Sequence, residues 1–268
     1  MNTTPRYLRK QFVLPLYFWL AILFLLLPIF VVLPISLTAG ELLQFPPKEW
    51  GLRWYRAFFA SDAWLNATQL SLKISIIACI LATFAGTLAA VALERGVWRG
   101  KSALFYFISS PLIIPHIFLA VGVFVLAVKT GFADNEYIVA GAHAAVTMPF
   151  IVLIVGAALK KVDLNIERAA RVLGAGPVRA FVSATLPSLL PAIMAGATLC
   201  FFVSFDELII AEFLLSSKET LPMKIWADVR LDLEPTVAAV SSLLIIASSV
   251  AIAAAELLRR RLNTGPSR

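Results

Sequence analysis

Charged residues are scarce in this chain. Asp, Glu, Lys and Arg make up only 15% of its 268 residues, whereas 60% of the residues are hydrophobic. A soluble protein of this size has about 25% charged and about 45–50% apolar residues. The shortage of charge excludes an ordinary soluble domain, and the excess of apolar residues predicts a membrane protein.

Cysteine and histidine are also rare, with two of each. Cys79 and Cys200 are isolated in apolar runs, so we expect them to pack as small apolar residues rather than to form a disulfide framework or a metal site. His116 and His143 belong to no HExxH motif, and no serine is paired with a base. The sequence therefore predicts no catalytic residue, no metal site and no cofactor, which argues against a membrane enzyme.

Long apolar runs, by contrast, recur along the chain. A spanning helix needs about 20 mostly apolar residues to cross a hydrocarbon core about 30 Å thick. Runs of this length lie at 12–38, 67–93, 103–128, 137–159, 188–215 and 236–258. Lipid offers the backbone no hydrogen-bond partner, and these runs are far too long for the strands of a barrel. We therefore predict an all-α membrane protein with about six transmembrane helices.

The first apolar run has two interpretations. Its basic start and the small residues at 38–40 are compatible with a cleaved signal peptide. The run is too long for such a peptide, however, and further spans follow it, so an uncleaved anchor is favoured. We accordingly treat residues 1–268 as a single transmembrane domain.

The net charge of +7 is unevenly distributed along the chain. With a cytoplasmic N-terminus, fifteen Lys and Arg residues fall in the two terminal segments and in the second and fourth loops, against seven on the other side. Cytoplasmic segments carry such an excess, so both termini are predicted to be cytoplasmic. The basic character therefore indicates topology and a lipid bilayer partner, not nucleic-acid binding.

The third apolar run contains Pro111 and Pro115, followed by His116. Each proline removes a backbone donor, so we expect the helix to be kinked or broken there. Transporters use broken helices where backbone lines a cavity, and a kink absorbed by packing is the simpler alternative.

The fourth loop, residues 160–187, has the pattern of two short helices. Asp163 or Asn165 can cap the first helix, and Gly174 and Gly176 can end it before Pro177 starts the second. Small and apolar residues then line one face of the first helix at Ile166, Ala169, Ala170 and Leu173. Such a face serves either to dock a partner closely or to lie against lipid headgroups.

The spacing of this loop resembles the EAA loop of ABC importer permeases. The matching positions are Ala169-Ala170, Gly174 after three residues, and Leu186-Pro187 after eleven more. The resemblance implies a type I importer permease fold, whose coupling helix docks on a cytoplasmic ATPase. The residues it implies for ATPase coupling are Glu167, Arg168, Ala169, Ala170, Leu173, Gly174 and Pro187. Arg168 stands where the family has glutamate, with Glu167 before it as a partial substitute, and Ala184 stands where the family has isoleucine.

Further motifs are similar to the permeases of spermidine/putrescine importers, and most similar to the second permease of those systems. They lie at 51–55 (GLRWY), 111–115 (PLIIP), 148–150 (MPF) and 204–207 (SFDE). The resemblance implies a bacterial inner-membrane complex of two permeases, expected to be different chains, with an ATPase dimer and a periplasmic substrate-binding protein. Polyamines are the expected cargo, with 4-aminobutyrate, opines and other small amines as alternatives.

A glycine-containing segment at 96–102 (GVWRGKS) superficially resembles a phosphate-binding loop. Such a loop needs four residues between its first glycine and the Gly-Lys pair, and a strand before it. This segment has three residues there and lies between two apolar runs. ATP hydrolysis is therefore expected from a separate chain, and this chain is not an enzyme.

The fifth apolar run carries Asp206, Glu207 and Glu212. A carboxylate at the centre of a span costs about 2.5–3.5 kcal/mol, so such residues are candidates for function. We expect Asp206 and Glu207, with Phe202 and Phe205, to line a substrate path, because a cation suits both carboxylates and aromatic faces. The alternatives are an ion pair with Lys73 or an anchoring role near the membrane interface.

One other transport mechanism competes with the importer. A secondary transporter of small amines or amino acids predicts inverted repeats with broken helices in both halves. The sequence has one proline-broken segment, without a counterpart in the other half. A secondary transporter also gives no reason for the motif spacing in residues 160–187. An importer permease is therefore the predicted function.

Overall fold

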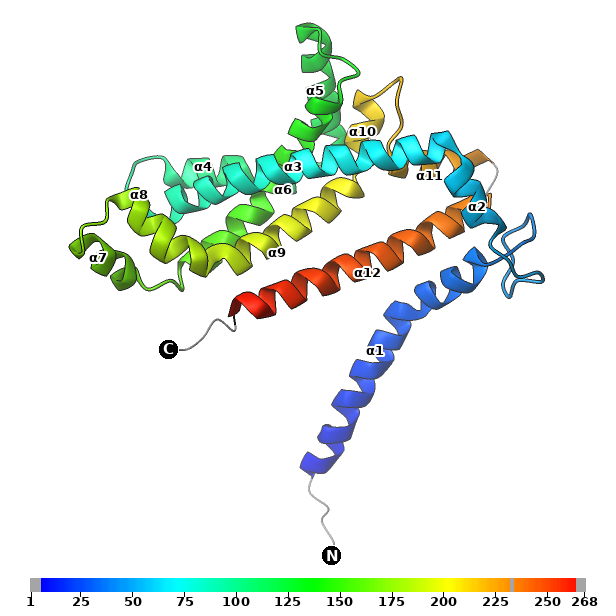
Figure 1. Cartoon of the computed structure of the whole chain (residues 1–268), viewed down its shortest axis with the longest axis horizontal. Helices are drawn as coiled ribbons and strands as arrows, with labels where there is room; N and C mark the ends of the chain where they lie inside the picture. Colours follow the sequence, from blue (N-terminus) through cyan, green and yellow to red (C-terminus); the bar gives the residue numbers. More distant parts are fainter. Residues whose placement is uncertain (1–5, 232–233, 264–268) are drawn as a thin grey trace, which may run out of the picture. The chain divides into compact units, whose positions relative to one another are not determined.

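The computed structural model describes residues 6–231 and 234–263, and this part of the chain is largely helical. Extended pairing within it is limited to an isolated bridge between Thr38 and Trp50. The helices are α1 (Arg6–Ser36), α2 (Arg53–Ala60), α3 (Asp62–Arg95), α4 (Lys101–Ser109), α5 (His116–Thr130), α6 (Glu136–Leu159), α7 (Leu164–Val172), α8 (Pro177–Ala180), α9 (Leu186–Phe205), α10 (Ile209–Leu214), α11 (Leu221–Leu231) and α12 (Thr236–Asn263) (Figure 1). The all-α prediction is confirmed.

Five segments of the described chain are long and apolar enough to cross a membrane as single spans. They are Leu14–Ser36, Asp62–Arg95, Glu136–Leu159, Pro177–Phe205 and Thr236–Ala254. The pair α4 and α5 meets the same criterion when its two halves are taken together. The predicted count of about six transmembrane helices is therefore confirmed.

The chain forms two compact units, and the smaller one contains the described residues before Asp62 together with Asp228–Ala247. In this unit α2 buries Trp54 and Phe58. The indole nitrogen of Trp54 donates to the Gly40 carbonyl over 2.9 Å, and the Tyr55 hydroxyl lies 2.7 Å from Ser36 Oγ and 2.6 Å from Ser242 Oγ. These polar contacts tie α2 to the end of α1 and to the first part of α12.

The larger unit contains Asp62–Ala227 and is built on α3, α6 and α9, which lie side by side (Figure 1). Two buried clusters form most of the contacts between its helices. The first joins α5, α6 and α10 through residues such as Ala127, Val139 and Ile210, and the second joins α3, α6 and α9 through Ala82, Ile151 and Leu189. Many of these residues are alanines, so the helix backbones can approach closely.

The tightest approach lies around Ile151 of α6. A methyl group added at Gly86 of α3 would lie 2.7 Å from Ile151 Cβ, and one added at Gly196 of α9 would lie 2.8 Å from Ile151 Cδ1. Ile151 is fully buried between these two glycines. Packing of one branched side chain between two glycines therefore sets the spacing of the three helices.

The third span is broken rather than kinked. A short 3-10 helix (Ser110–Leu112) follows α4, and α5 begins only at His116, with a bend of 102° between the two halves. Pro115 has an extended backbone, with ψ at 135°, and occupies the N-cap of α5. Because a proline also disfavours helical geometry in the residue before it, Pro115 ends the first half and starts the second.

The fifth span differs from the prediction. The apolar run at 188–215 was expected to be one helix, but α9 ends at Phe205 and the separate helix α10 starts at Ile209. The backbone N–H groups of Ile210 and Ala211 donate to the Glu207 carboxylate, which acts as a new helix cap. The run at 188–215 therefore forms two helices, and Asp206 and Glu207 lie in the break between them.

We predict that Gly86→Ala and Gly196→Ala each destabilise the larger unit, because the added methyl group must displace Ile151. Overpacking of this kind costs about 1–3 kcal/mol. The midpoint of thermal unfolding in detergent should fall for both variants. Gly122→Ala is the matched control, since a methyl group there meets nothing within 4 Å. An equal melting temperature for Gly86→Ala and Gly122→Ala would contradict this description of the core.

Candidate functional site

The fourth loop folds into two short helices joined by a tight turn, as predicted. Asp163 is the N-cap of α7, and its carboxylate accepts the Asn165 N–H over 2.9 Å. The turn follows at Gly174, whose φ of +92° is a conformation that residues with a side chain rarely adopt. Pro177 then occupies the first turn of α8. The predicted helix cap, the turn and the start of the second helix at Pro177 are confirmed.

The tip of this loop exposes apolar side chains. Val172 and Leu173 are each 88% exposed and Val178 is 77% exposed. Among the other residues predicted for coupling, Arg168 and Ala169 are exposed, Ala170 is partly buried, and Pro187 is exposed in the first turn of α9. Three exposed branched residues on one short loop form a surface suited to an apolar partner. We refer to Val172, Leu173, Gly174 and Val178 as the apolar tip.

Glu167 points the other way, into the protein. It is only 7% exposed, and its carboxylate accepts from the Thr185 hydroxyl over 2.8 Å, from Arg171 over 2.9 Å and from Arg95. The Arg95 guanidinium also lies 5.7 Å from the centre of the Phe181 ring. These contacts join α7 to the end of α3 and to the π-helical segment Phe181–Thr185 that leads into α9. We call this set of residues the Glu167 clamp.

The electrostatics of the Glu167 clamp follow from these contacts. Burial by itself raises the pKa of Glu167, but the hydrogen bonds from Thr185, Arg95 and Arg171 and the charge of Arg95 outweigh it. The pKa of Glu167 is therefore lower than its ordinary value. Sequence reasoning found Glu167 but not Arg95 or Thr185, because they come from segments 72 and 18 residues away.

Asp206 lies at the C-terminal end of α9 and is exposed. Its backbone N–H donates to the Phe202 carbonyl, whereas its carboxylate has no hydrogen bond or ion pair with any residue in the described ranges. The partial negative charge of a helix C-terminus makes a free carboxylate there unfavourable unless a cation comes close. Phe202 and Phe205 are partly buried next to it and both contact Phe201, with ring centres 5.5 Å and 5.8 Å apart.

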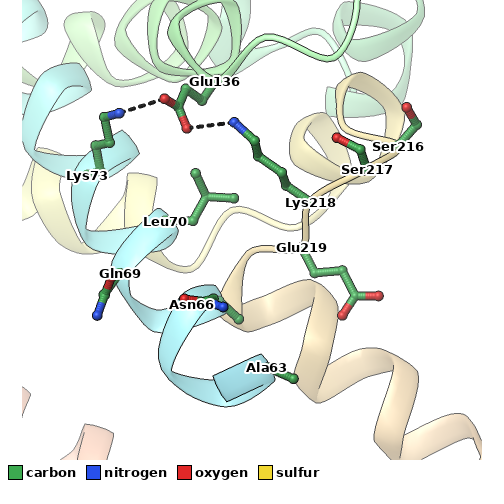
Figure 2. A pocket seen from close by; sticks show the side chains of 11 residues that line it. Ala63, Asn66, Gln69, Leu70, Lys73, Glu136, Ser216, Ser217, Lys218 and Glu219 are labelled. Carbon is green, nitrogen blue, oxygen red and sulfur yellow. Dashed lines mark hydrogen bonds and ion pairs between the residues drawn. The ribbon is translucent and has the colours of Figure 1, made fainter. Parts of the chain in front are cut away.

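Lys73 is not the partner of Asp206, although the sequence left that ion pair open. Its ammonium group lies 2.6 Å from Glu136 Oε1 and 5.1 Å from the centre of the Tyr137 ring. Lys218 approaches the other oxygen of Glu136 at 3.4 Å, so the two lysines point at one carboxylate (Figure 2).

These three residues line a pocket of about 590 Å³ between the start of α3, the start of α6 and residues 216–219 (Figure 2). Asp134 fixes the nearby loop, because its carboxylate accepts from the Ser217 hydroxyl and from the backbone N–H groups of Ser216 and Ser217. The same hydrogen bonds lower the pKa of Asp134 to about 2. The pocket was not predicted, since its residues are spread over three distant segments.

Glu207 is buried at 7% exposure, in contrast to its neighbour Asp206. Its carboxylate accepts the Ile210 N–H over 2.9 Å and lies 3.2 Å from His143 Nε2 and 3.4 Å from His116 Nδ1. His143 Nδ1 lies in turn 2.9 Å from the Ser204 hydroxyl. The two histidines, which the sequence left without a role, thus meet on one of the predicted carboxylates.

Sequence comparison identifies the family to which this chain belongs. Residues 82–264 match the family described as the binding-protein-dependent transport system inner membrane component, and the chain belongs to this family. It is 33% identical over 204 residues to the putrescine transport system permease protein PotI of Escherichia coli, covering 73% of each chain. It is also 33% identical over 218 residues to the spermidine/putrescine transport system permease protein PotC of the same organism, covering 80% of this chain and 81% of PotC.

Solved structures show the same fold. A chain of a bacterial ABC transporter that imports the polysaccharide alginate superposes with a TM-score of 0.73 at 16% identity, covering 96% of this chain and 99% of that one. A chain of the methionine transporter MetNI in an inward-facing conformation superposes with a TM-score of 0.61 at 20% identity, covering 75% and 96%.

The protein is thus an ABC importer permease, a transport subunit of the inner membrane rather than an enzyme, as predicted. Permeases of this class work with an ATPase and a periplasmic binding protein.

We predict that Glu167→Gln lowers stability by about 1–3 kcal/mol at neutral pH, because it removes the charge that Arg95 and Arg171 contact. The pKa of Glu167 is lower in the folded than in the unfolded protein. The ionised carboxylate therefore stabilises the fold fully at pH values above the unfolded pKa, and this stabilisation is lost as pH falls through the folded pKa. The melting temperatures of wild type and variant should therefore converge as pH falls below about 4.5. The exposed Glu219→Gln is the control, and a difference that persists in acid would contradict this account.

Proposed function

We propose that this chain is one of two permease subunits that move polyamines, or related small organic amines, from the periplasm to the cytoplasm. The relatives named for putrescine and spermidine support this substrate class. The observation that carries the proposal is the free, exposed carboxylate of Asp206 at the end of an apolar span, since a polyamine is a cation. ATP hydrolysis by a separate subunit supplies the driving force.

The proposed orientation places both chain termini in the cytoplasm. The distribution of lysine and arginine supports this, because the second and fourth loops and the two terminal segments carry most of these residues. The Glu167 clamp and the apolar tip then face the cytoplasm, and the pocket around Glu136 faces the periplasm. In this orientation the whole chain acts as one permease domain.

Asp206 and the phenylalanines beside it are the proposed contacts for the substrate. A protonated amine gains from the unpaired carboxylate and from the negative end of α9, and its methylene groups suit the faces of Phe202 and Phe205. Glu207 belongs to the same stretch of the path but does not contact the substrate. Its carboxylate is already in contact with backbone N–H groups and two imidazoles, so its role is to hold this stretch in place.

The apolar tip is the proposed contact with the ATPase. Exposed Val172 and Leu173 suit an apolar groove, and the turn at Gly174 holds them at the end of α7. Arg168 and Ala169 extend this surface along α7, Ala170 lies at its edge, and Pro187 fixes the start of the following span. Glu167 does not reach the partner in this arrangement, and it acts by holding α7 to α3.

The proposed complex contains a second, different permease, a dimer of ATPase subunits and a periplasmic binding protein. The mixed-charge pocket around Glu136, on the proposed periplasmic side, offers the binding protein two lysines and the exposed carboxylate of Glu219 (Figure 2). Such surfaces steer encounter between partners more than they add affinity.

We predict that Asp206→Asn raises the KM for putrescine uptake about tenfold or more, because a charge-assisted contact is lost. A neutral substrate analogue should be affected far less. Uptake by membrane vesicles that contain the complete importer measures both values. Glu212→Gln removes an exposed carboxylate six residues further on and should leave the KM unchanged. Equal losses for charged and neutral substrates would show that Asp206 is structural.

We predict that Gly174→Val abolishes the stimulation of ATP hydrolysis by the loaded binding protein while membrane insertion is retained. The left-handed backbone at Gly174 resists any side chain, so the apolar tip should be displaced. Gly176→Val is the matched control, because this glycine has a φ of −64° and both positions have open space around them. Full stimulation in Gly174→Val would overturn the docking role.

A further inference from the structure

Both histidines of the chain contact the same buried carboxylate. Glu207 lies between His116, the first residue of α5, and His143 in the middle of α6. His143 is 1% exposed, whereas the His116 side chain is 37% exposed. A chain with only two histidines has thus placed each of them within 3.4 Å of one acidic group.

The contacts of this group come from several helices. His143 Nε2 lies 3.2 Å from one oxygen of the Glu207 carboxylate, and Nδ1 of the same ring hydrogen-bonds with the Ser204 hydroxyl over 2.9 Å. The second carboxylate oxygen is approached by His116 Nδ1, and the backbone N–H groups of α10 complete the set. A buried carboxylate is stable only with such partners.

The group also joins the breaks in the third and fifth apolar runs. His116 starts α5 directly after the break at Pro115, and Glu207 lies in the break between the end of α9 at Phe205 and the start of α10 at Ile209. Beyond these breaks α5 and α10 pack in one buried cluster, which includes Ala120, Ala127, Ile210 and Leu214. The carboxylate therefore fixes the end of α9, and the adjacent Asp206 with it, against α5 and α6.

We propose that Glu207 is a positioning residue for import: through His116 and His143 it holds the break after α9 against the break before α5 and so presents Asp206 to the substrate. The proposal rests on the assignment of Asp206 as a substrate contact. It gives the two histidines one function, since each holds the carboxylate from a different helix. It also gives the two neighbouring acids different roles, because Asp206 contacts the substrate and Glu207 positions Asp206.

Cysteine labelling tests the position of residue 206 without any transport. Asp206→Cys in the complete importer is labelled with a positively charged methanethiosulfonate reagent, and the parent chain measures background labelling of Cys79 and Cys200. Adding His116→Leu or Glu207→Gln should change the labelling rate about fivefold or more, and adding Glu212→Gln should not. His116→Asn should restore the rate, because its amide nitrogen can donate from nearly the place of Nδ1.

Uptake kinetics, measured with Asp206 intact, supply the second readout. His116→Leu and Glu207→Gln should each raise the KM for putrescine about fivefold with little change in kcat, and the double variant should be no worse than Glu207→Gln alone. Unchanged labelling and unchanged KM in His116→Leu would overturn the proposal, as would a lower melting temperature with normal kinetics. If Glu207→Gln fails to fold while His116→Leu behaves as wild type, the link to His116 is also refuted.

The two hypotheses fail separately. If Asp206→Asn leaves putrescine uptake unchanged but the labelling rate still depends on His116 and Glu207, the substrate contact is wrong and the positioning link is retained. If Asp206→Asn impairs uptake of cations but labelling is independent of His116, the substrate contact is retained and the positioning role is rejected.

Discussion

A lipid bilayer offers polar groups no hydrogen-bond partner, and the main features of this protein follow from that constraint. The apolar runs become helices because only helices satisfy their own backbone. Where a helix stops inside such a run, another group must complete it. Glu207 does so after α9 by accepting N–H groups of α10, and Pro115 does so at the start of α5, where its carbonyl accepts the Phe118 N–H over 3.0 Å. The breaks are therefore built sites with their own polar partners.

A second consequence concerns packing, because lipid and side chains are equally apolar and close contact must hold the helices together. Ile151 between Gly86 and Gly196 brings α3, α6 and α9 together. At the end of these helices the Glu167 clamp fastens α7 to Arg95 and Thr185. The fourth loop is thereby connected to the spanning helix α3 through the Glu167 carboxylate.

The sequence was sufficient to predict about six spans, because these depend on the length of the apolar runs. It was also sufficient to predict the helix cap, the turn and the second short helix of the fourth loop, because local turn residues encode them. It was insufficient for the break at residues 206–208, since the apolar run continues to residue 215 beyond Asp206 and Glu207, and the break depends on the contacts that the Glu207 carboxylate makes in the folded protein. It also missed the partners of Glu167 and Glu207, which depend on contacts between distant segments such as Arg95 and His116. The secondary transporter was argued against for lack of a second broken span. The structure interrupts the fifth apolar run between α9 and α10 as well, so family membership, rather than that argument, decides the mechanism.

The central claim is that this chain forms an ATP-driven path for an organic cation. Reconstituting it in liposomes with its second permease, ATPase and binding protein tests the claim most directly, with labelled putrescine outside and ATP inside. The account predicts uptake that requires ATP and the binding protein, persists when ionophores remove all ion gradients, and is inhibited by spermidine but not by neutral amino-acid derivatives. Uptake that continues without ATP and stops when the gradients are removed would contradict it.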